Sequence, residues 1–422
     1  MPFLLCSMLK KQTLRKLAAY FSAMVLVHGF LLWKARYDIA SGLPDFSSFY
    51  TAAKMLQDGH GHQLYDLSSQ EATQISVVPV SVKKRRAALP YNHPPFEAIM
   101  FLPLASFSYT TAYWVWFVIN IGLLTGVVVT LRKSLPTLRG ASFLLWAAAC
   151  LSFDPIFIAL IQGQDSILLL FCFCMVFAAL RRGSDSRAGC WLGFALFKFQ
   201  VVLPFMVPFF FLRRKAILRT LLSVAALLTL VGLKAVGWQG SLHYPSFVWA
   251  LNHNAKLRPL VASQGTASLY GLISSVTRSK HPDLSVGLLL VLSAILLAIS
   301  TAVWRRAQPA EFQSNQLAMA ANLLIALLLG YHIWLHDLSV LFLAILLILE
   351  FLASNPLLLH SWAKRIILVC MAILFCSPIT FVLLAYHKLY GITTVILVLL
   401  LVLVAEIFRL QRRGMVEASN LA

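Results

Sequence analysis

The stretch Pro44-Asp45-Phe46-Ser47-Ser48-Phe49-Tyr50 follows closely on an apolar run, residues 17–33, that is long enough to cross a membrane. Asp45 is an acid among apolar and aromatic residues, and it opens a short amphipathic run, residues 46–56. A carboxylate held at a membrane surface can act on a lipid-borne substrate. Asp is also a preferred N-cap residue, so Asp45 is equally expected to cap the helix that follows, and the two roles are compatible.

The composition indicates an all-α, polytopic integral membrane protein. Of the 422 residues, 60% are hydrophobic and 12% are charged, whereas a soluble protein has about 25% charged residues. The apolar residues fall in blocks of about 20 residues, which suit membrane helices, and not in the short alternating segments of a β-barrel. The net charge of +20 does not indicate a nucleic-acid partner, because Lys and Arg lie at the ends of the apolar blocks, as the positive-inside rule requires.

We predict a single membrane domain, residues 1–422, with about twelve crossings and both termini in the cytoplasm. The first apolar run is longer than a signal-peptide core and lacks a clear cleavage site, so it is expected to remain as a span. Basic clusters flank residues 188–212 on both sides, which predicts a short hairpin with Lys198-Phe199-Gln200 at its tip. The expected spans are about 17–33, 113–131, 141–161, 166–180, the two arms of the hairpin, 216–236, 284–304, 315–333, 338–353, 366–386 and 392–408. The span 141–161 is expected to be broken at Asp154-Pro155.

Two larger outer segments, 34–108 and 237–283, and a cytoplasmic tail, 409–422, complete the chain. The first segment contains Tyr91-Asn92-His93-Pro94-Pro95-Phe96, in which the double proline ends one element and begins a helix. It also contains the basic run 83–86, which we expect to be a solvated loop or a contact for lipid phosphate. The second segment is rich in Trp and Tyr, which favour the membrane–water interface. The seven cysteines show no spacing typical of a metal site or a disulfide framework.

Unusual polar residues collect at the outer ends of the predicted spans. Ionisable groups at membrane depth are costly and usually functional. These residues are Asp45, Tyr91, His93, Gln162, Gln164, Asp165, Lys198, His332, His336 and Asp337. The sequence shows no glycine-rich phosphate loop, no recognisable Ser–His–Asp arrangement and no metal-ligand spacing beyond isolated pairs, so no metal site is predicted.

The order of several short motifs resembles glycosyltransferase family 87, whose members are polytopic enzymes of the GT-C fold class. The matching pieces are Asp45-Phe46-x-x-Phe49-Tyr50-x-Ala52-Ala53, Gly61 with Leu64-Tyr65-Asp66, Tyr91-x-x-Pro94-Pro95-Phe96, Gln162-Gly163-Gln164, Gly193 with Lys198, and the stretch with His332, Trp334 and His336-Asp337. The sequence departs from the family pattern at His93, before the double proline, and at Asp165, where the family often has a small amide or hydroxyl residue. The late His motif also lacks the Ser-Pro that often opens it.

This resemblance implies a GT-C-like bundle that transfers a sugar from a polyprenyl-phosphate donor to a hydroxyl of a lipid or glycan acceptor on the outer face. The sugar is mannose or arabinofuranose in known members, and we expect mannose. The resemblance places the general base at Asp45, where a carboxylate can accept the proton of the attacking hydroxyl. One displacement through an oxocarbenium-like state predicts inversion at C1.

The leaving lipid phosphate needs cations or hydrogen-bond donors. We expect Lys198, His332 and His336 to face this phosphate, and Tyr91, Gln164 and Asp337 to position substrate. Because the leaving group is a lipid monophosphate, the hypothesis requires no cofactor and no metal.

The main alternative is a transporter or flippase of a lipid-linked sugar, which would share the hydropathy and the intramembrane charges. Transporters often have two related halves, and we find no clear internal repeat. A structural membrane protein is a third possibility, which the long polar and aromatic outer segments disfavour. In each case we expect a multi-pass protein of a bacterial inner or plasma membrane, surrounded by lipid.

Overall fold

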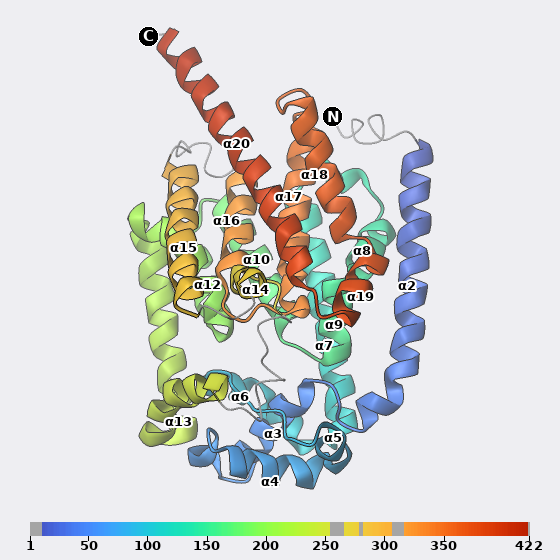
Figure 1. The fold of residues 1–422 in the computed structure, drawn as a ribbon, viewed down its shortest axis with the longest axis vertical. Coiled ribbons are helices and arrows are strands. Elements are labelled where there is room, and N and C mark those ends of the chain that lie inside the picture. Colours follow the sequence, from blue (N-terminus) through green and yellow to red (C-terminus); the bar gives the residue numbers. More distant parts are fainter. Residues whose placement is uncertain (1–10, 254–265, 278–281, 306–315, 421–422) are drawn as a thin grey trace.

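The computed structural model describes residues 11–253, 266–277, 282–305 and 316–420, and within these the chain forms only helices and their connections (Figure 1). Parts of the second outer segment, residues 254–265 and 278–281, and the last two residues of the predicted tail lie outside the described residues. An upper bundle of long helices stands on a lower layer of short ones (Figure 1).

The upper bundle contains the long apolar helices together with several shorter ones. Its members are α2 (Lys11–Ala40), α7 (Tyr109–Ser134), α8 (Phe143–Leu151), α9 (Asp154–Gln162), α10 (Ser166–Arg181), α11 (Asp185–Phe194), α12 (Phe199–Phe211), α13 (Lys215–His253), α15 (Pro282–Arg305), α16 (Gln316–Leu329), α17 (Leu341–Ser354), α18 (Ser361–Leu374), α19 (Ser377–Ala385) and α20 (Tyr390–Asn420). Short 3₁₀ segments, η3 (Leu138–Gly140), η4 (Ala195–Lys198) and η7 (Leu335–Val340), connect some of them, and α14 (Leu269–Val276) packs against α20.

The lower layer is built mainly from the first outer segment. It contains α3 (Phe46–Gln57), η1 (Gly61–Gln63), α4 (Leu67–Val77), α5 (Pro79–Arg85), α6 (Pro95–Phe101) and η2 (Leu102–Ser106). Pro95 occupies the first turn of α6, as the double proline predicts. The second part of α13 joins this layer after a kink at Gly237, whose φ is 73°. The predicted second outer segment therefore begins as a helix.

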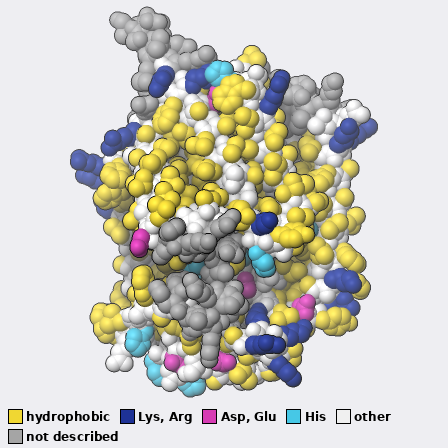
Figure 2. Space-filling view, viewed as in Figure 1, with side chains coloured by type: hydrophobic (Ala, Val, Ile, Leu, Met, Phe, Trp, Pro, Cys, Tyr) yellow, Lys and Arg dark blue, Asp and Glu magenta, His cyan; other side chains and the backbone are white. Residues whose placement is uncertain are grey.

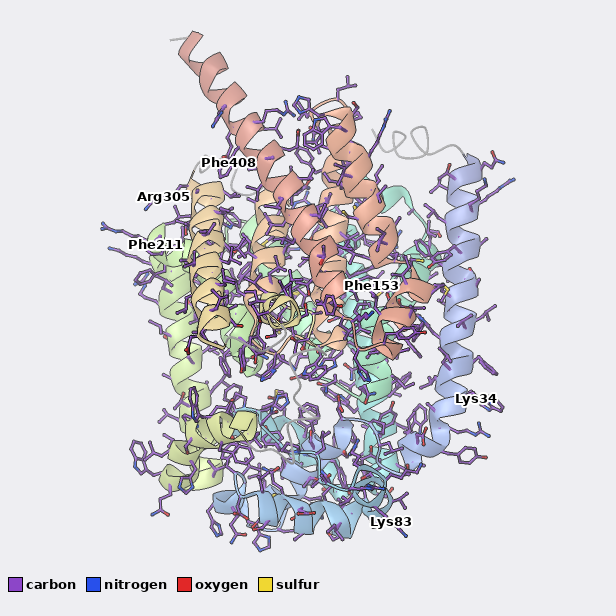
Figure 3. The ribbon with its side chains drawn as sticks, viewed as in Figure 1. Lys34, Lys83, Phe153, Phe211, Arg305 and Phe408 are labelled. Atoms are coloured by element: carbon purple, nitrogen blue, oxygen red, sulfur yellow. The ribbon has the colours of Figure 1, made fainter. Side chains whose placement is uncertain are left out.

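The core lies in the middle of the bundle. Helices α16 and α17 are almost wholly buried and apolar around their circumference apart from a few polar residues, among them Asn322 in α16 and Glu350 in α17, as expected for helices enclosed by others. Helix α2 stands at the edge and exposes large apolar side chains such as Leu26 and Trp33. On the face shown in Figure 2, the surface of the bundle is largely apolar. Figure 3 places Arg305 and Phe408 in the upper part of the molecule and Lys34 and Lys83 in the lower part.

Seven described helices are long and apolar enough to cross a membrane, and the number rises to nine if each of two bent helix pairs is one crossing. One of these pairs is α8 and α9, bent by 68° at the Asp154-Pro155 break that the sequence predicts. The predicted number of about twelve is larger for two reasons. Helices α10 and α16 are apolar but only 16 and 14 residues long, and the segment Asp185–Phe211 counts as one helix by length.

The segment Asp185–Phe211 nevertheless folds back on itself at η4. Twenty-seven residues of straight helix would be about 40 Å long. Arg214, three residues beyond the segment, donates from Nε to Oδ2 of Asp185 at 2.7 Å, so the two ends of the segment meet. The turn between α11 and α12 therefore carries Lys198 at its tip, inside the bundle.

Candidate functional site

Asp45 immediately precedes α3, at the N-cap position, but its carboxylate makes no capping hydrogen bond. The carboxylate instead accepts a hydrogen bond from Nε2 of Gln164, with Oδ2 at 2.8 Å. The Asp45 backbone N–H donates to Oε1 of Gln162 at 3.1 Å. The side chain is half-buried, so Asp45 occupies the helix terminus while its carboxylate faces the turn between α9 and α10.

The Gln162-Gly163-Gln164 turn can hold Asp45 from both sides because Gly163 adopts a left-handed conformation, with φ +62°. A Cβ at Gly163 would lie 2.7 Å from Cβ of Phe46 and 3.2 Å from the Tyr113 ring. The Gly163 carbonyl also accepts a hydrogen bond from Nε1 of Trp116 at 3.0 Å. Glycine is therefore required for both the backbone angle and the close approach to α3.

We expect Gly163→Ala to lower the thermal stability of the detergent-solubilised protein and its activity together. The left-handed conformation alone costs about 1–2 kcal/mol for a residue with a Cβ, and the contact with Phe46 adds to this. Gly122→Ala is the matched control, because Gly122 lies in α7 and a Cβ added there would meet nothing within 4 Å. Equal melting temperatures for the two variants would contradict the role assigned to Gly163.

Lys198 is the buried cation of the site. Its Nζ lies 3.1 Å from Oδ1 of Asp165 and 3.2 Å from Oδ1 of Asp337, and all three side chains are buried. Asp337 Oδ1 also accepts from the Ser166 hydroxyl at 2.8 Å, and its Oδ2 accepts from the Trp334 backbone N–H at 3.0 Å. One lysine thus links the α9–α10 turn to η7.

A second buried group adjoins Lys198. Nδ1 of His93 lies 2.9 Å from Oε2 of Glu97 and 3.9 Å from Oδ2 of Asp165. Burial raises the pKa of Glu97 to about 7 and that of Asp165 to about 7, against the opposing effect of the Lys198 charge. Burial and Lys198 lower the pKa of His93 to about 4, which favours the neutral imidazole.

The other predicted site residues lie close by, in different settings. His336 is buried in η7, with Nε2 3.6 Å from Oδ2 of Asp337. His332 lies between α16 and η7 against the Tyr331 ring, and burial lowers its pKa to about 4. Tyr91 is buried and its hydroxyl donates to the Pro94 carbonyl at 3.0 Å, so here it shapes the loop before α6. Its contact with substrate stays a prediction.

Two further residues belong to this region and were not among the predicted site residues. Glu97 follows His93 by four residues, and an acid directly after a double proline and a Phe, at the start of an apolar run, was the available signal. Arg85 belongs to the basic run 83–86, but its guanidinium turns inward to donate to the Leu43 carbonyl, with Nη1 3.5 Å from the Ser47 hydroxyl. Its positive charge also interacts with Asp45. Arg85 is therefore not a solvated loop residue.

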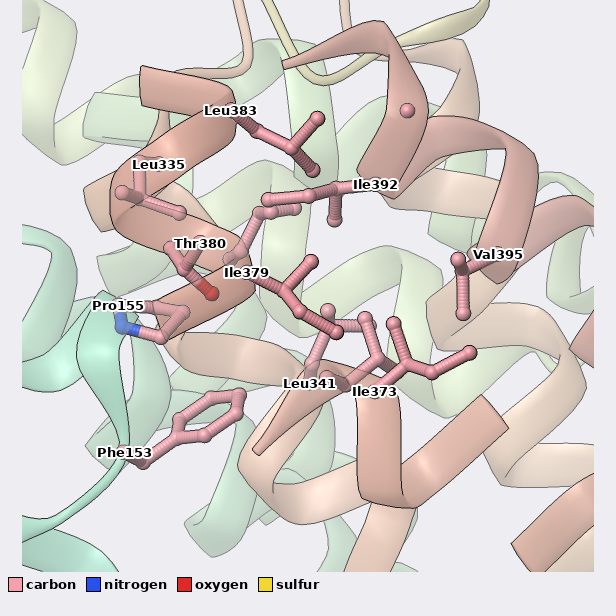
Figure 4. Close-up of a pocket in the computed structure, with 13 residues that line it drawn as sticks. Phe153, Pro155, Leu335, Leu341, Ile373, Ile379, Thr380, Leu383, Ile392 and Val395 are labelled. Carbon is pink, nitrogen blue, oxygen red and sulfur yellow. The ribbon is translucent and has the colours of Figure 1, made fainter. Parts of the chain in front are cut away.

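An apolar cavity of about 320 Å³ lies beside η7 (Figure 4). Helices α9, α17, α18, α19 and α20 contribute to its walls. Figure 4 shows Ile379, Leu383 and Ile392 turned toward one another across the space. Leu335 and Leu338 line it from η7, and these residues flank His336 and Asp337 in the chain. An apolar compartment therefore adjoins the charged one.

The arrangement can support group transfer at a membrane surface, because it combines a carboxylate without a capping role, a buried cation and an adjoining apolar space. A search of curated proteins and a search of solved structures found no match to the chain. The model of one protein family, glycosyltransferase family 87, matches residues 91–335, which is more than half of the chain. The chain belongs to glycosyltransferase family 87.

Proposed function

We propose that this membrane glycosyltransferase moves a sugar, mannose first among the candidates, from a polyprenyl-phosphate donor to a hydroxyl of a lipid or glycan acceptor. Asp45 is the general base of the proposal. The observation that carries it is the hydrogen bond from Gln164 to Oδ2 of Asp45. An acid at this position would ordinarily cap its helix, but the Asp45 carboxylate makes no capping bond, so its other oxygen can take the proton of the acceptor.

In the proposed step, the acceptor hydroxyl attacks C1 of the sugar while Asp45 takes its proton. The C1–O bond to the phosphate breaks, and the electron pair leaves with the lipid phosphate. This single displacement inverts the configuration at C1. Gln164 orients Asp45 by donating to Oδ2, and such orientation of a catalytic group accounts for much of an enzyme's rate advantage.

The leaving phosphate gains negative charge during the step, so a cation near it lowers the barrier. Lys198 is buried at the junction of two helix connections, and it is the candidate for this role together with His332 and His336. The reaction as written uses no cofactor.

The apolar cavity beside η7 fits the first part of the donor's polyprenyl chain. Every residue that lines it is apolar except Thr380, and burying each CH₂ group contributes about 0.8 kcal/mol. The position of Leu335 and Leu338 beside Asp337 would place the chain's phosphate end next to Lys198.

We expect Ile379→Trp to raise the KM for a long-chain polyprenyl donor by about tenfold, equivalent to about 1.4 kcal/mol of lost binding, because the larger ring fills the cavity. Val382→Trp is the matched control, since Val382 lies on the same helix, is exposed and does not line the cavity. The effect is expected to shrink with a short-chain donor. A KM that changes equally in both variants would exclude the cavity as the chain's binding site.

Orientation follows from the positive-inside rule. Arg305 lies near the upper end of the bundle in Figure 3. The beginning of α2 and the end of α20 also lie at this end (Figure 1). We propose that this end faces the cytoplasm of a bacterium, with Asp45 and the lower layer on the outer side of the inner or plasma membrane.

The test is sugar transfer by purified protein in lipid vesicles. A panel of polyprenyl-phosphate sugars and an extract of native lipids supply donors and acceptors. Transfer with one donor that depends on Asp45 supports the proposal. Movement of the lipid-linked sugar across the bilayer without transfer would overturn it in favour of a flippase.

A further inference from the structure

We propose that His93, Glu97 and Asp165 form a binding site for a divalent metal ion of the Mn²⁺ or Zn²⁺ type. Nothing in the spacing of these residues along the chain predicts this, because Asp165 is distant from the other two. The structure brings them together where α6 meets the α9–α10 turn.

The distances between the candidate ligand atoms suit one ion. One ligand atom from each residue lies within 4.8 Å of the others, and Nδ1 of His93 is 2.9 Å from Oε2 of Glu97. Ligands at about 2.0–2.2 Å from a metal lie roughly 3.0–3.4 Å apart when adjacent. Small movements of the Asp165 carboxylate would therefore complete the site.

Two buried carboxylate oxygens of this group lack a hydrogen-bond donor among the described residues. Glu97 and Asp165 are fully buried, and neither Oε1 of Glu97 nor Oδ2 of Asp165 accepts a hydrogen bond from any described residue. Buried polar atoms are nearly always paired, and two carboxylates facing each other repel unless a proton or a cation lies between them. Lys198 lies beside Oδ1 of Asp165 and leaves the other oxygen for an ion.

The charge of the region favours a bound cation. The charges of Asp45, Asp165 and Asp337 act on His93, Oε2 of Glu97 lies 2.9 Å from its Nδ1, and Lys198 is the cation that acts on the same imidazole. A phosphate donor is itself an anion, and it must enter this acidic region. A divalent ion would offset this repulsion, an argument that rests on the proposed function, whereas the binding of the ion does not.

The fold holds two of the proposed ligands, His93 and Glu97, in place without a metal ion. His93 is followed by two prolines, and its carbonyl accepts a hydrogen bond from the Tyr65 hydroxyl at 2.8 Å. Glu97 lies one turn later on α6. One imidazole and two carboxylates suit Mn²⁺ or Zn²⁺ better than Ca²⁺, which prefers oxygen ligands alone. Three protein ligands leave a position open for a substrate oxygen, as in catalytic metal sites.

The experiment measures metal binding by the full-length protein in detergent after treatment with a chelator. Mn²⁺ binding is followed by electron paramagnetic resonance, with Zn²⁺ as competitor, and by the metal-induced rise in melting temperature. We expect one ion per chain in the wild type. Glu97→Gln and Asp165→Asn should each weaken binding by at least about tenfold and remove the thermal shift. Glu71→Gln, an exposed acid on α4, should bind as the wild type does.

His93→Asn provides a third variant if either carboxylate variant does not fold, since the His93 side chain is partly exposed and its loss should also weaken binding. Absence of bound metal in the wild type, or equal binding in the wild type and the variants, would overturn the proposal and assign a shared proton to the Glu97–Asp165 pair. Since binding is measured without substrate, its failure and a failure of the proposed sugar transfer are separate results.

Discussion

Asp45→Asn is expected to lower the rate of sugar transfer by about 10²–10⁴-fold, the usual contribution of a general base, with little change in the KM for the donor. Asn has nearly the same shape as Asp, and its amide oxygen can still accept the hydrogen bond from Gln164. The fold around α3 should therefore persist while the proton acceptor is lost. Initial rates in lipid vesicles, measured at several donor concentrations, separate kcat from KM.

Asp58→Asn is the matched control for this prediction. Asp58 ends the same helix, its side chain is exposed, and its ion pair with Lys54 is 3.7 Å long. Transfer by this variant should equal that of the wild type. Full activity of Asp45→Asn with the correct donor would exclude Asp45 as the base, and Asp337 would then be the acid to test.

Lys198→Met is expected to destabilise the protein by about 3–5 kcal/mol, because removing one partner of a buried ion pair leaves charge without compensation. Here one cation serves two carboxylates, Asp165 and Asp337, and all three side chains are at most 5% exposed. Thermal unfolding in detergent, followed by tryptophan fluorescence, measures the change. Sugar transfer should be lost as well, because the leaving phosphate loses its nearest candidate cation.

Lys84→Met controls for the loss of a lysine. Lys84 pairs with Asp38 at 3.2 Å, but both side chains are more than half exposed, and such pairs contribute about 0–1 kcal/mol. Adding Asp337→Asn to Lys198→Met should recover part of the lost stability, since Asn can still accept from Ser166 and no longer carries a charge. If Lys198→Met unfolds at the wild-type temperature, the lysine does not hold the two helix connections together.

The predicted helices correspond closely to those observed because length and hydropathy act locally. The Asp154-Pro155 break and the start of α6 at Pro95 each follow from neighbouring residues. The turn at Lys198 follows from the basic clusters on both sides of residues 188–212. Span number was harder to predict. Helices α10 and α16 are shorter than a bilayer crossing requires by themselves, and their burial within the bundle makes full length unnecessary.

The candidate site was likewise predicted only in part. The sequence predicts that Asp45, Lys198 and Asp337 lie near the outer ends of spans, because the predicted topology brings the ends of those spans to the same side. It could not pair Lys198 with both Asp165 and Asp337, nor show that the Asp45 carboxylate bonds to Gln164 and not to its own helix. Two of the three departures from the family pattern, at His93 and Asp165, are far apart in the sequence, but Nδ1 of His93 lies 3.9 Å from Oδ2 of Asp165 in the structure.

By itself, the sequence determined that this chain is a helical membrane protein with an acid after its first span, because apolar block length and charge position are properties of short segments. Only the tertiary structure decided which charges meet. Pairing Glu97 with Asp165 or Lys198 with Asp337 depends on how α6, the α9–α10 turn, η4 and η7 pack against one another. In a buried region of low dielectric constant, a difference of a few ångströms decides whether two charges stabilise or repel each other.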